Sequence, residues 1–89
     1  MAEYRGYLIP RHKLPFWDLI IVDNDFVTHR RYKMIGVDEK RIPLKAINGV
    51  ELKRGVLFCS IIINSMGETI VAEGFTNADG KEIRRLLGF

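Results

Sequence analysis

Two segments in the first half of the chain have the composition and patterning of β-strands. Residues 16–22 read FWDLIIV and are rich in aromatic and β-branched side chains, and residues 26–35 alternate between two faces. The sequence DND at 23–25 separates these segments and favours a turn, because Asp and Asn side chains bond to nearby backbone. The pattern therefore predicts a β-hairpin over residues 16–35.

The next segment changes its period twice. Its apolar residues fall at steps of two, three, three and two: Ile42, Leu44, Ile47, Val50 and Leu52. Neither a single strand nor a single helix fits these steps. They predict a short strand ending near Pro43, then one tight helical turn or corner, then a second strand. A hairpin turn at Asn48-Gly49 is the alternative, and residues 36–40, GVDEK, are predicted to form a polar loop.

Two strands and a helix are predicted in the remainder of the chain. Residues 56–65, VLFCSIIINS, are apolar on both faces, which predicts a strand covered by the core on one side and by a helix or partner chain on the other. A turn at 66–68 leads to a strand over 69–75. Thr76 is a good N-cap for a helix with an apolar stripe and a terminal glycine: Ile83, Leu86, Leu87 and Gly88.

The first fifteen residues are less regular. Four apolar residues predict a short edge strand: Tyr4, Tyr7, Leu8 and Ile9. Pro10 and Pro15 bracket a basic turn, since proline is confined to strand ends and edges. We therefore expect residues 1–15 to form an N-terminal arm or edge strand. Residues 16–89 are expected to form one mainly β domain, a small bent barrel of six or seven antiparallel strands capped by one C-terminal α-helix.

The composition is that of a small globular domain, with 89 residues, 47% of them apolar and 28% charged. So short a chain buries a limited core, and oligomerisation would add stability. Cys59 is the single cysteine, so the chain has no internal disulfide, which fits a reducing compartment. The apolar runs are too short to span a bilayer and the N-terminus lacks a secretion signal. We expect a soluble, cytoplasmic protein that is not transmembrane.

The charge is mildly basic, with a formal net charge of +3 and a sequence pI near 9.2. Three basic residues, His29, Arg31 and Lys33, fall on one face of a predicted strand and could hold an anionic partner. A solvated face whose charges protect an edge strand is the preferred interpretation. Three aromatic residues are predicted to lie in the core rather than to form a platform for nucleic-acid bases: Phe16, Trp17 and Phe58.

No pattern in the sequence indicates a catalytic, cofactor or metal site. Asp23 and Asp25 lack the further oxygen ligands of a calcium loop. His12 and His29 have no cysteine or carboxylate at zinc-ligand spacing, and Cys59 lies in the most apolar strand, where a thiol behaves as a small hydrophobic group. Because a glycine-rich phosphate loop is also missing, we do not expect an enzyme or a bound cofactor.

The order of the motifs resembles the bacterial pleckstrin-homology-like (PH-like) domain family. The matching segments, which together cover about residues 16–87, are a strand carrying VTHRR, then IPLKAINGV, an S-I-I-I strand, a Gly-containing turn and the ending GF…A…EIRRLL. The resemblance implies a bent, partly open barrel of two near-orthogonal sheets capped by the C-terminal helix. Eukaryotic lipid-binding members carry a basic signature between their first two strands; here that turn is DND, so specific phosphoinositide binding is not expected.

The resemblance and the residue pattern together suggest a non-catalytic protein-interaction or self-assembly module. An open sheet edge and a strand that is apolar on both faces predict pairing with a further copy, giving a homo-oligomer, or with another protein. The face carrying Val56, Phe58 and Ile62 is the expected self-association or covered surface. The alternative is a small basic nucleic-acid-binding protein or phage-type inhibitor that acts through an anion-binding surface.

Overall fold

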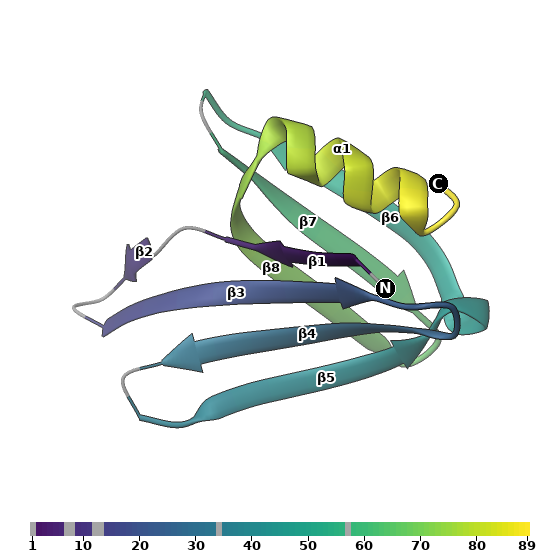
Figure 1. Cartoon of the computed structure of the whole chain (residues 1–89), viewed down its shortest axis with the longest axis horizontal. Coiled ribbons are helices and arrows are strands. Elements are labelled where there is room, and N and C mark those ends of the chain that lie inside the picture. The colour runs from purple at the N-terminus through teal and green to yellow at the C-terminus, as the bar shows by residue number, and fades with distance from the viewer. Residues whose placement is uncertain (1, 7–8, 12–13, 34, 57) are drawn as a thin grey trace.

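The computed structural model describes residues 2–6, 9–11, 14–33, 35–56 and 58–89. Strands and helices follow one another along the chain as drawn in Figure 1. The elements are β1 (Ala2–Arg5), β2 (Ile9–Arg11), β3 (Leu14–Val22), β4 (Phe26–Lys33), β5 (Val37–Pro43), the 3-10 turn η1 (Leu44–Ala46), β6 (Ile47–Arg54), β7 (Phe58–Ser65), β8 (Glu68–Thr76) and α1 (Asn77–Leu86). The protein is therefore mainly β with one C-terminal helix, as predicted.

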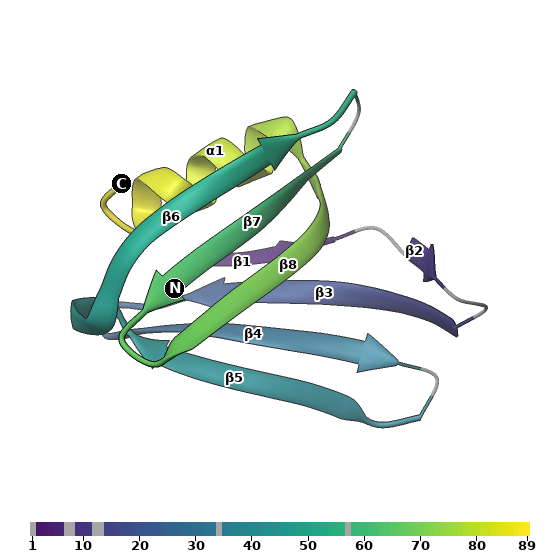
Figure 2. The same ribbon diagram turned by 180° about the vertical axis from the view of Figure 1, so that it is seen from behind.

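The strands form two antiparallel sheets. The first sheet has five strands, in which β3, β4 and β5 are neighbours and both β1 and β2 pair with β3. The second sheet contains three strands in the order β6-β7-β8. The two sheets face each other across the core, with α1 on the inner side of the second sheet (Figures 1 and 2).

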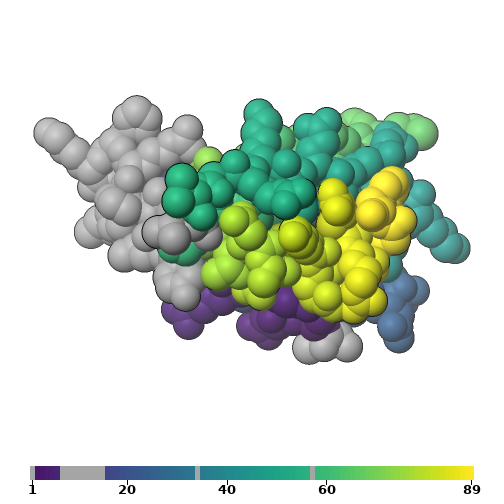
Figure 3. Space-filling view, turned by 90° about the horizontal axis from the view of Figure 1, so that it is seen from above, coloured from purple at the N-terminus to yellow at the C-terminus, as the bar shows by residue number. Residues whose placement is uncertain are grey.

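The core lies between the two sheets and the helix. Its fully buried side chains come from all three layers, among them Ile20, Val27, Ile61, Ile63, Ile70, Phe75 and Ile83. Viewed from above, α1 lies between the N-terminal strand β1 and strand β6 (Figure 3). The helix thus covers one open side of the sandwich, and Ile83 and Leu87 extend the core on that side.

The predicted hairpin and corner are both confirmed. Asp23 Oδ1 accepts hydrogen bonds from the backbone N–H groups of Asp25 at 2.8 Å and Phe26 at 2.7 Å, which closes the turn between β3 and β4. The chain then leaves the first sheet at Pro43, makes the single turn η1 and enters the second sheet at Ile47. The double change of period marks this passage between sheets.

Two sequence predictions about local structure are wrong, and the alternative of a hairpin turn at Asn48-Gly49 is not observed. The predicted loop over residues 36–40 is largely strand, since β5 begins at Val37; its side chains are exposed up to Arg41, so no apolar alternation reveals it. Asn48-Gly49 lies inside β6, where the register with β7 shifts, and makes no hairpin turn. Val56 precedes β7, in a turn closed by the Gly55 N–H and the Phe58 carbonyl at 2.7 Å.

The described strands do not close into a barrel. Each strand pairs only within its own sheet, and no ladder joins the first sheet to the second. The sheets are connected by η1, by packing in the core and by side chains of the first sheet that reach the free edge of β8. In place of the expected bent barrel, the structure has two facing sheets, and α1 lies between strand β1 of the first sheet and strand β6 of the second (Figure 3).

Helix α1 begins and ends where the sequence predicts. Thr76 Oγ1 accepts a hydrogen bond from the Asp79 N–H at 3.1 Å, and at the C-terminus the N–H groups of Gly88 and Phe89 donate to the carbonyls of Arg85 and Arg84. This is a Schellman motif, and Gly88 supplies its positive φ of 87°. The helix is capped at both ends by local interactions.

Replacing Thr76 by alanine should remove the N-terminal cap and lower the free energy of unfolding by about 1 kcal/mol. Thr76→Ser keeps the hydroxyl and is the matched control, expected to stay close to the parent protein. Urea denaturation followed by circular dichroism measures both. Equal stabilities of the two variants would show that the cap contributes nothing.

Candidate functional site

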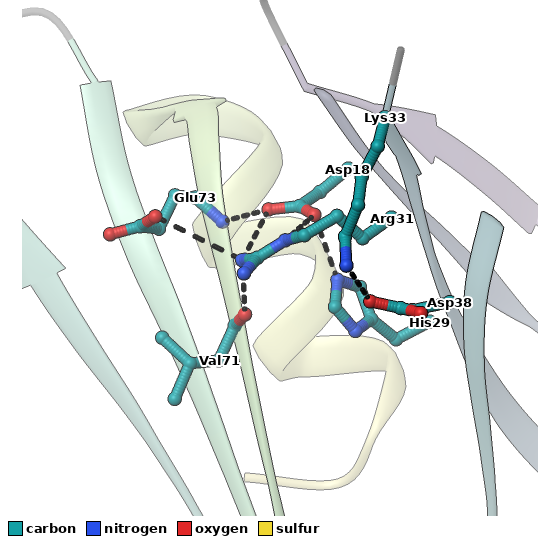
Figure 4. Close-up of polar contacts among 7 residues, drawn as sticks. All are labelled: Asp18, His29, Arg31, Lys33, Asp38, Val71 and Glu73. Carbon is teal, nitrogen blue, oxygen red and sulfur yellow. Dashed lines mark hydrogen bonds and ion pairs between the residues drawn. The ribbon is translucent and has the colours of Figure 1, made fainter. Parts of the chain in front are cut away.

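The inner face of the first sheet carries a buried charged cluster. Asp18 lies in the middle of β3, and its cross-strand partner on β4 is Arg31, with His29 two positions along the same face. The Asp18 side chain is completely buried. We call Asp18, His29, Arg31 and Glu73 the Asp18 cluster (Figure 4).

Asp18 accepts four hydrogen bonds within this cluster. Its Oδ1 lies 3.0 Å from His29 Nε2 and 2.8 Å from Arg31 Nε. Its Oδ2 accepts from Arg31 Nη2 at 3.2 Å and from the backbone N–H of Glu73 at 2.7 Å. Both carboxylate oxygens are therefore fully used by protein donors, and these donors come from β4 and from the distant strand β8.

These contacts hold Asp18 in its charged form. Burial by itself raises the pKa of a carboxyl group, because it disfavours the anion. The hydrogen bonds from His29, Arg31 and the Glu73 backbone outweigh burial, so the pKa of Asp18 is lowered from its ordinary value. The same ion pair raises the pKa of Arg31. At neutral pH the cluster contains a carboxylate matched by a guanidinium.

Side chains of the first sheet also donate hydrogen bonds to main-chain carbonyls along the edge of β8 that does not pair with β7. Arg31 Nη2 donates to the Val71 carbonyl at 3.0 Å, and Lys40 Nζ donates to the Thr69 carbonyl at 3.3 Å. Together with the Asp18 bond to Glu73, they replace the ladder that a closed barrel would have here. A cleft of about 250 Å³ remains beside them, lined by His29, Arg31, Asp38, Lys40, Thr69, Ile70 and Val71.

The three residues predicted to form an anionic-partner surface share one face of β4, but each faces a carboxylate. His29 is 7% exposed and Arg31 is partly buried, and both contact Asp18. Lys33 Nζ lies 2.5 Å from Asp38 Oδ2 at the surface. The positive charges of Arg31 and Lys33 are thus matched by carboxylates within the chain, and the predicted anion-binding role stays a prediction.

Asp18 was not singled out from the sequence. The available signal was an acidic residue in the middle of the apolar strand FWDLIIV, on the same face as Phe16 and Ile20. A lone carboxylate in such a position requires a buried partner. The identity of that partner depends on the register of β3 against β4, which the sequence pattern does not give.

Two of the three aromatic residues predicted to lie in the core are elsewhere. Phe16 is buried, but Trp17 is half-buried on the outer face of the first sheet, where it stacks on Tyr32 with ring centroids 4.0 Å apart. The Arg5 guanidinium lies 4.2 Å from the Trp17 ring. Phe58 is 41% exposed on the second sheet. Strand alternation explains the error, because Phe16 and Trp17 are adjacent and must face opposite sides.

The outer face of the second sheet carries exposed apolar side chains. Ile62 on β7 is the cross-strand partner of Val71 on β8, and Phe58 lies on the same face of β7. Phe58 is 41% and Val71 is 44% exposed, whereas Cys59, Ile61 and Ile63 point into the core. Figure 2 shows this face uncovered, with α1 behind the sheet. We call Phe58, Ile62 and Val71 the outer apolar patch; Val56, 96% exposed, lies in the preceding turn.

The described residues contain no group of three or more His, Cys, Asp and Glu side chains placed to hold a metal ion. Cys59 is a free, buried cysteine, and burial raises the pKa of its thiol. Its Sγ donates to the Thr76 carbonyl at 3.5 Å. Among the described residues no helix has the length and apolar character needed to cross a membrane.

Comparison with known protein families gives a match. A family model described as a bacterial PH domain matches residues 11–88, which is most of the chain. Neither the curated proteins nor the solved structures contain a significant match to this sequence.

Proposed function

Because the chain belongs to the bacterial PH domain family, we propose that it is a non-catalytic protein-interaction module that self-associates through the outer apolar patch. The observation that carries this proposal is the exposure of Phe58 and Val71 on a sheet face that no described element of the chain covers. In a small domain, apolar side chains gathered on one exposed face favour a protein partner.

The composition of this face suits such a role. Ile62 and Val71 are directly opposite each other on neighbouring strands, so their side chains form a continuous surface. Ser60, Asn64 and Thr69 lie beside them on the same face, and on β6 the charged Glu51 lies directly opposite Ile62, with Lys53 opposite Ser60. An apolar centre within a polar rim is the usual anatomy of a protein interface.

The alternative of an anion-binding protein has weaker support. A phosphate backbone is bound by cations that are free to replace condensed counterions. Arg31 is already bonded to a buried carboxylate, and Lys33 is paired with Asp38. The compensation of these charges favours a protein partner over a nucleic acid.

The double substitution Phe58→Ser with Val71→Thr tests the proposed patch. We expect the parent protein to associate as its concentration rises and the variant to associate at least about tenfold more weakly, because burial of the two side chains is lost. Sedimentation equilibrium over a wide concentration range measures the dissociation constants. Val71→Thr keeps a β-branched side chain, so β8 should be preserved.

Phe89→Ser is the matched control, since Phe89 is exposed at the C-terminus, away from the patch. It should leave association unchanged. A parent protein that stays monomeric at the highest concentration, or a patch variant that associates as well as the parent, would contradict the proposal.

A further inference from the structure

Strand β5 forms an edge of the first sheet. It pairs with β4 on one side, and in both ribbon views it lies at the margin of the molecule (Figures 1 and 2). It spans seven residues, Val37–Pro43, and six of them are exposed. An exposed strand edge of this length is a template for pairing with another strand.

Hydrogen bonds at the two ends of the β4–β5 ladder show which N–H and C=O groups of β5 bond to β4 and which point away from it. The Lys33 N–H bonds to the Gly36 carbonyl at 3.2 Å, and the Leu44 N–H bonds to the Asp25 carbonyl at 2.9 Å. Hydrogen-bonded pairs alternate along an antiparallel ladder. The bonded residues of β5 are therefore the even-numbered ones, and the N–H and C=O groups of Val37, Glu39 and Arg41 point away from β4.

The charge order DEKR at 38–41 limits which strands can pair with this edge. Charged edges discourage indiscriminate pairing. Two antiparallel copies of β5 would match best with Asp38 opposite Arg41 and Glu39 opposite Lys40. That register is excluded, because each outward-pointing residue of one copy would then lie opposite a residue of the other copy whose N–H and C=O groups are already bonded to β4.

The allowed register centred on Glu39 is also complementary. Asp38 of each copy then faces Lys40 of the other, giving two pairs of opposite charge in addition to the contacts that Asp38 makes with Lys33 and Lys40 with the Thr69 carbonyl within each copy. Glu39 meets Glu39, but Arg30 Nε lies 2.5 Å from Glu39 Oε1 in each copy and offsets the repulsion. Val37 and Arg41 face each other at both ends, and all three outward-pointing residues have an N–H to donate. The allowed register centred on Lys40 gains two Glu39–Arg41 pairs, but it places Lys40 against Lys40 and uses Pro43, which has no N–H. The one centred on Asp38 places Asp38 against Asp38.

We propose that the free edge of β5 pairs with β5 of a second copy, in the antiparallel register centred on Glu39. This contact joins the first sheets of two molecules into one continuous sheet. It uses main-chain groups and charges on the first sheet, whereas the outer apolar patch lies on the second sheet, so it is a separate interface.

The charge pattern is tested in the Phe58→Ser, Val71→Thr background, where the patch no longer contributes. There we expect a dimer. Adding Lys40→Asp places Asp38 of each copy opposite an acidic side chain at position 40 of the other copy. The two repulsive pairs should raise the dissociation constant of the dimer at least about tenfold. Combining Lys40→Asp with Asp38→Lys restores opposite charges and should restore the dimer. Lys81→Asp, an exposed helix residue, makes the same charge change elsewhere and should have no effect.

The main-chain contribution is tested at Glu39. Its N–H does not serve the ladder with β4, so Glu39→Pro should leave the fold intact, as checked by circular dichroism, while removing a donor at the centre of the contact. Glu39→Ala loses the same carboxylate but keeps the N–H. We expect the alanine variant to dimerise and the proline variant to be monomeric.

The two proposals fail in distinguishable ways. A monomeric patch variant, equal association of Lys40→Asp and its charge-swapped partner, or equal association of Glu39→Pro and Glu39→Ala would each overturn β5 pairing. A patch variant that is monomeric beside an associating parent would overturn β5 pairing and support the patch. The other two results leave the patch proposal untouched, because its own test compares the parent protein with the patch variant.

Discussion

Replacing Asp18 by alanine is expected to lower the free energy of unfolding by about 3 kcal/mol. The substitution removes the acceptor for His29, for Arg31 and for the Glu73 N–H, and it leaves a partly buried guanidinium without its carboxylate. Since a domain of this size has only about 5–10 kcal/mol of stability, the loss should be evident in urea denaturation as a large shift of the midpoint.

Asp38→Ala is the control for this experiment, because it removes a carboxylate that pairs with Lys33 at the exposed surface. Surface ion pairs contribute little, so Asp38→Ala should change stability far less than Asp18→Ala. If the two variants were equally stable, the buried cluster would not hold the sheets together.

The stability conferred by Asp18 should also depend on pH. Because its pKa is lower in the folded protein than in the unfolded chain, its contribution is complete above the unfolded value of about 3.9 and is lost as pH falls below it towards the folded value. The difference in stability between the parent and Asp18→Asn should be flat near neutral pH and shrink in that acidic range. A difference that persists unchanged in acid would contradict this assignment.

Replacing Phe75 by alanine should have the largest effect on stability, a loss of about 4 kcal/mol. Phe75 is completely buried in the core cluster formed by the two sheets and α1. Its removal both loses buried apolar surface and leaves a cavity at this junction. Thermal and urea unfolding of the variant measure the loss.

Phe89→Ala provides the comparison, because the same ring is half-exposed at the C-terminus. It should change stability by no more than about 0.5 kcal/mol. Similar losses for the two phenylalanines would mean that the packing around Phe75 is not as the structure describes.

The elements that the sequence predicts well are those fixed by local interactions. The DND turn closes through Asp23 onto backbone two and three residues away, and α1 is defined by Thr76 and Gly88 at its ends. The corner after Pro43 was visible as a change of period. The first half of β5 was missed because an exposed edge strand has one paired neighbour and no buried face to impose alternation.

The candidate site could be predicted only in part. His29, Arg31 and Lys33 were correctly assigned to one face of a strand, but their carboxylate partners depend on the ladder register and on β8. Asp18 is 11 and 13 residues from His29 and Arg31 and 55 residues from Glu73. Periodicity describes which residues share a face; it does not say which strands that face will meet.

The sequence by itself determined the class of the fold, the position of its main turns and corner, and the capped C-terminal helix, because each depends on residues close together in the chain. The tertiary structure decided that the basic face of β4 turns inward onto Asp18, that Phe58 and Val71 stay exposed, and that β5 is an edge. These outcomes depend on how distant strands pair and pack, and long-range register and burial are not encoded in any single segment.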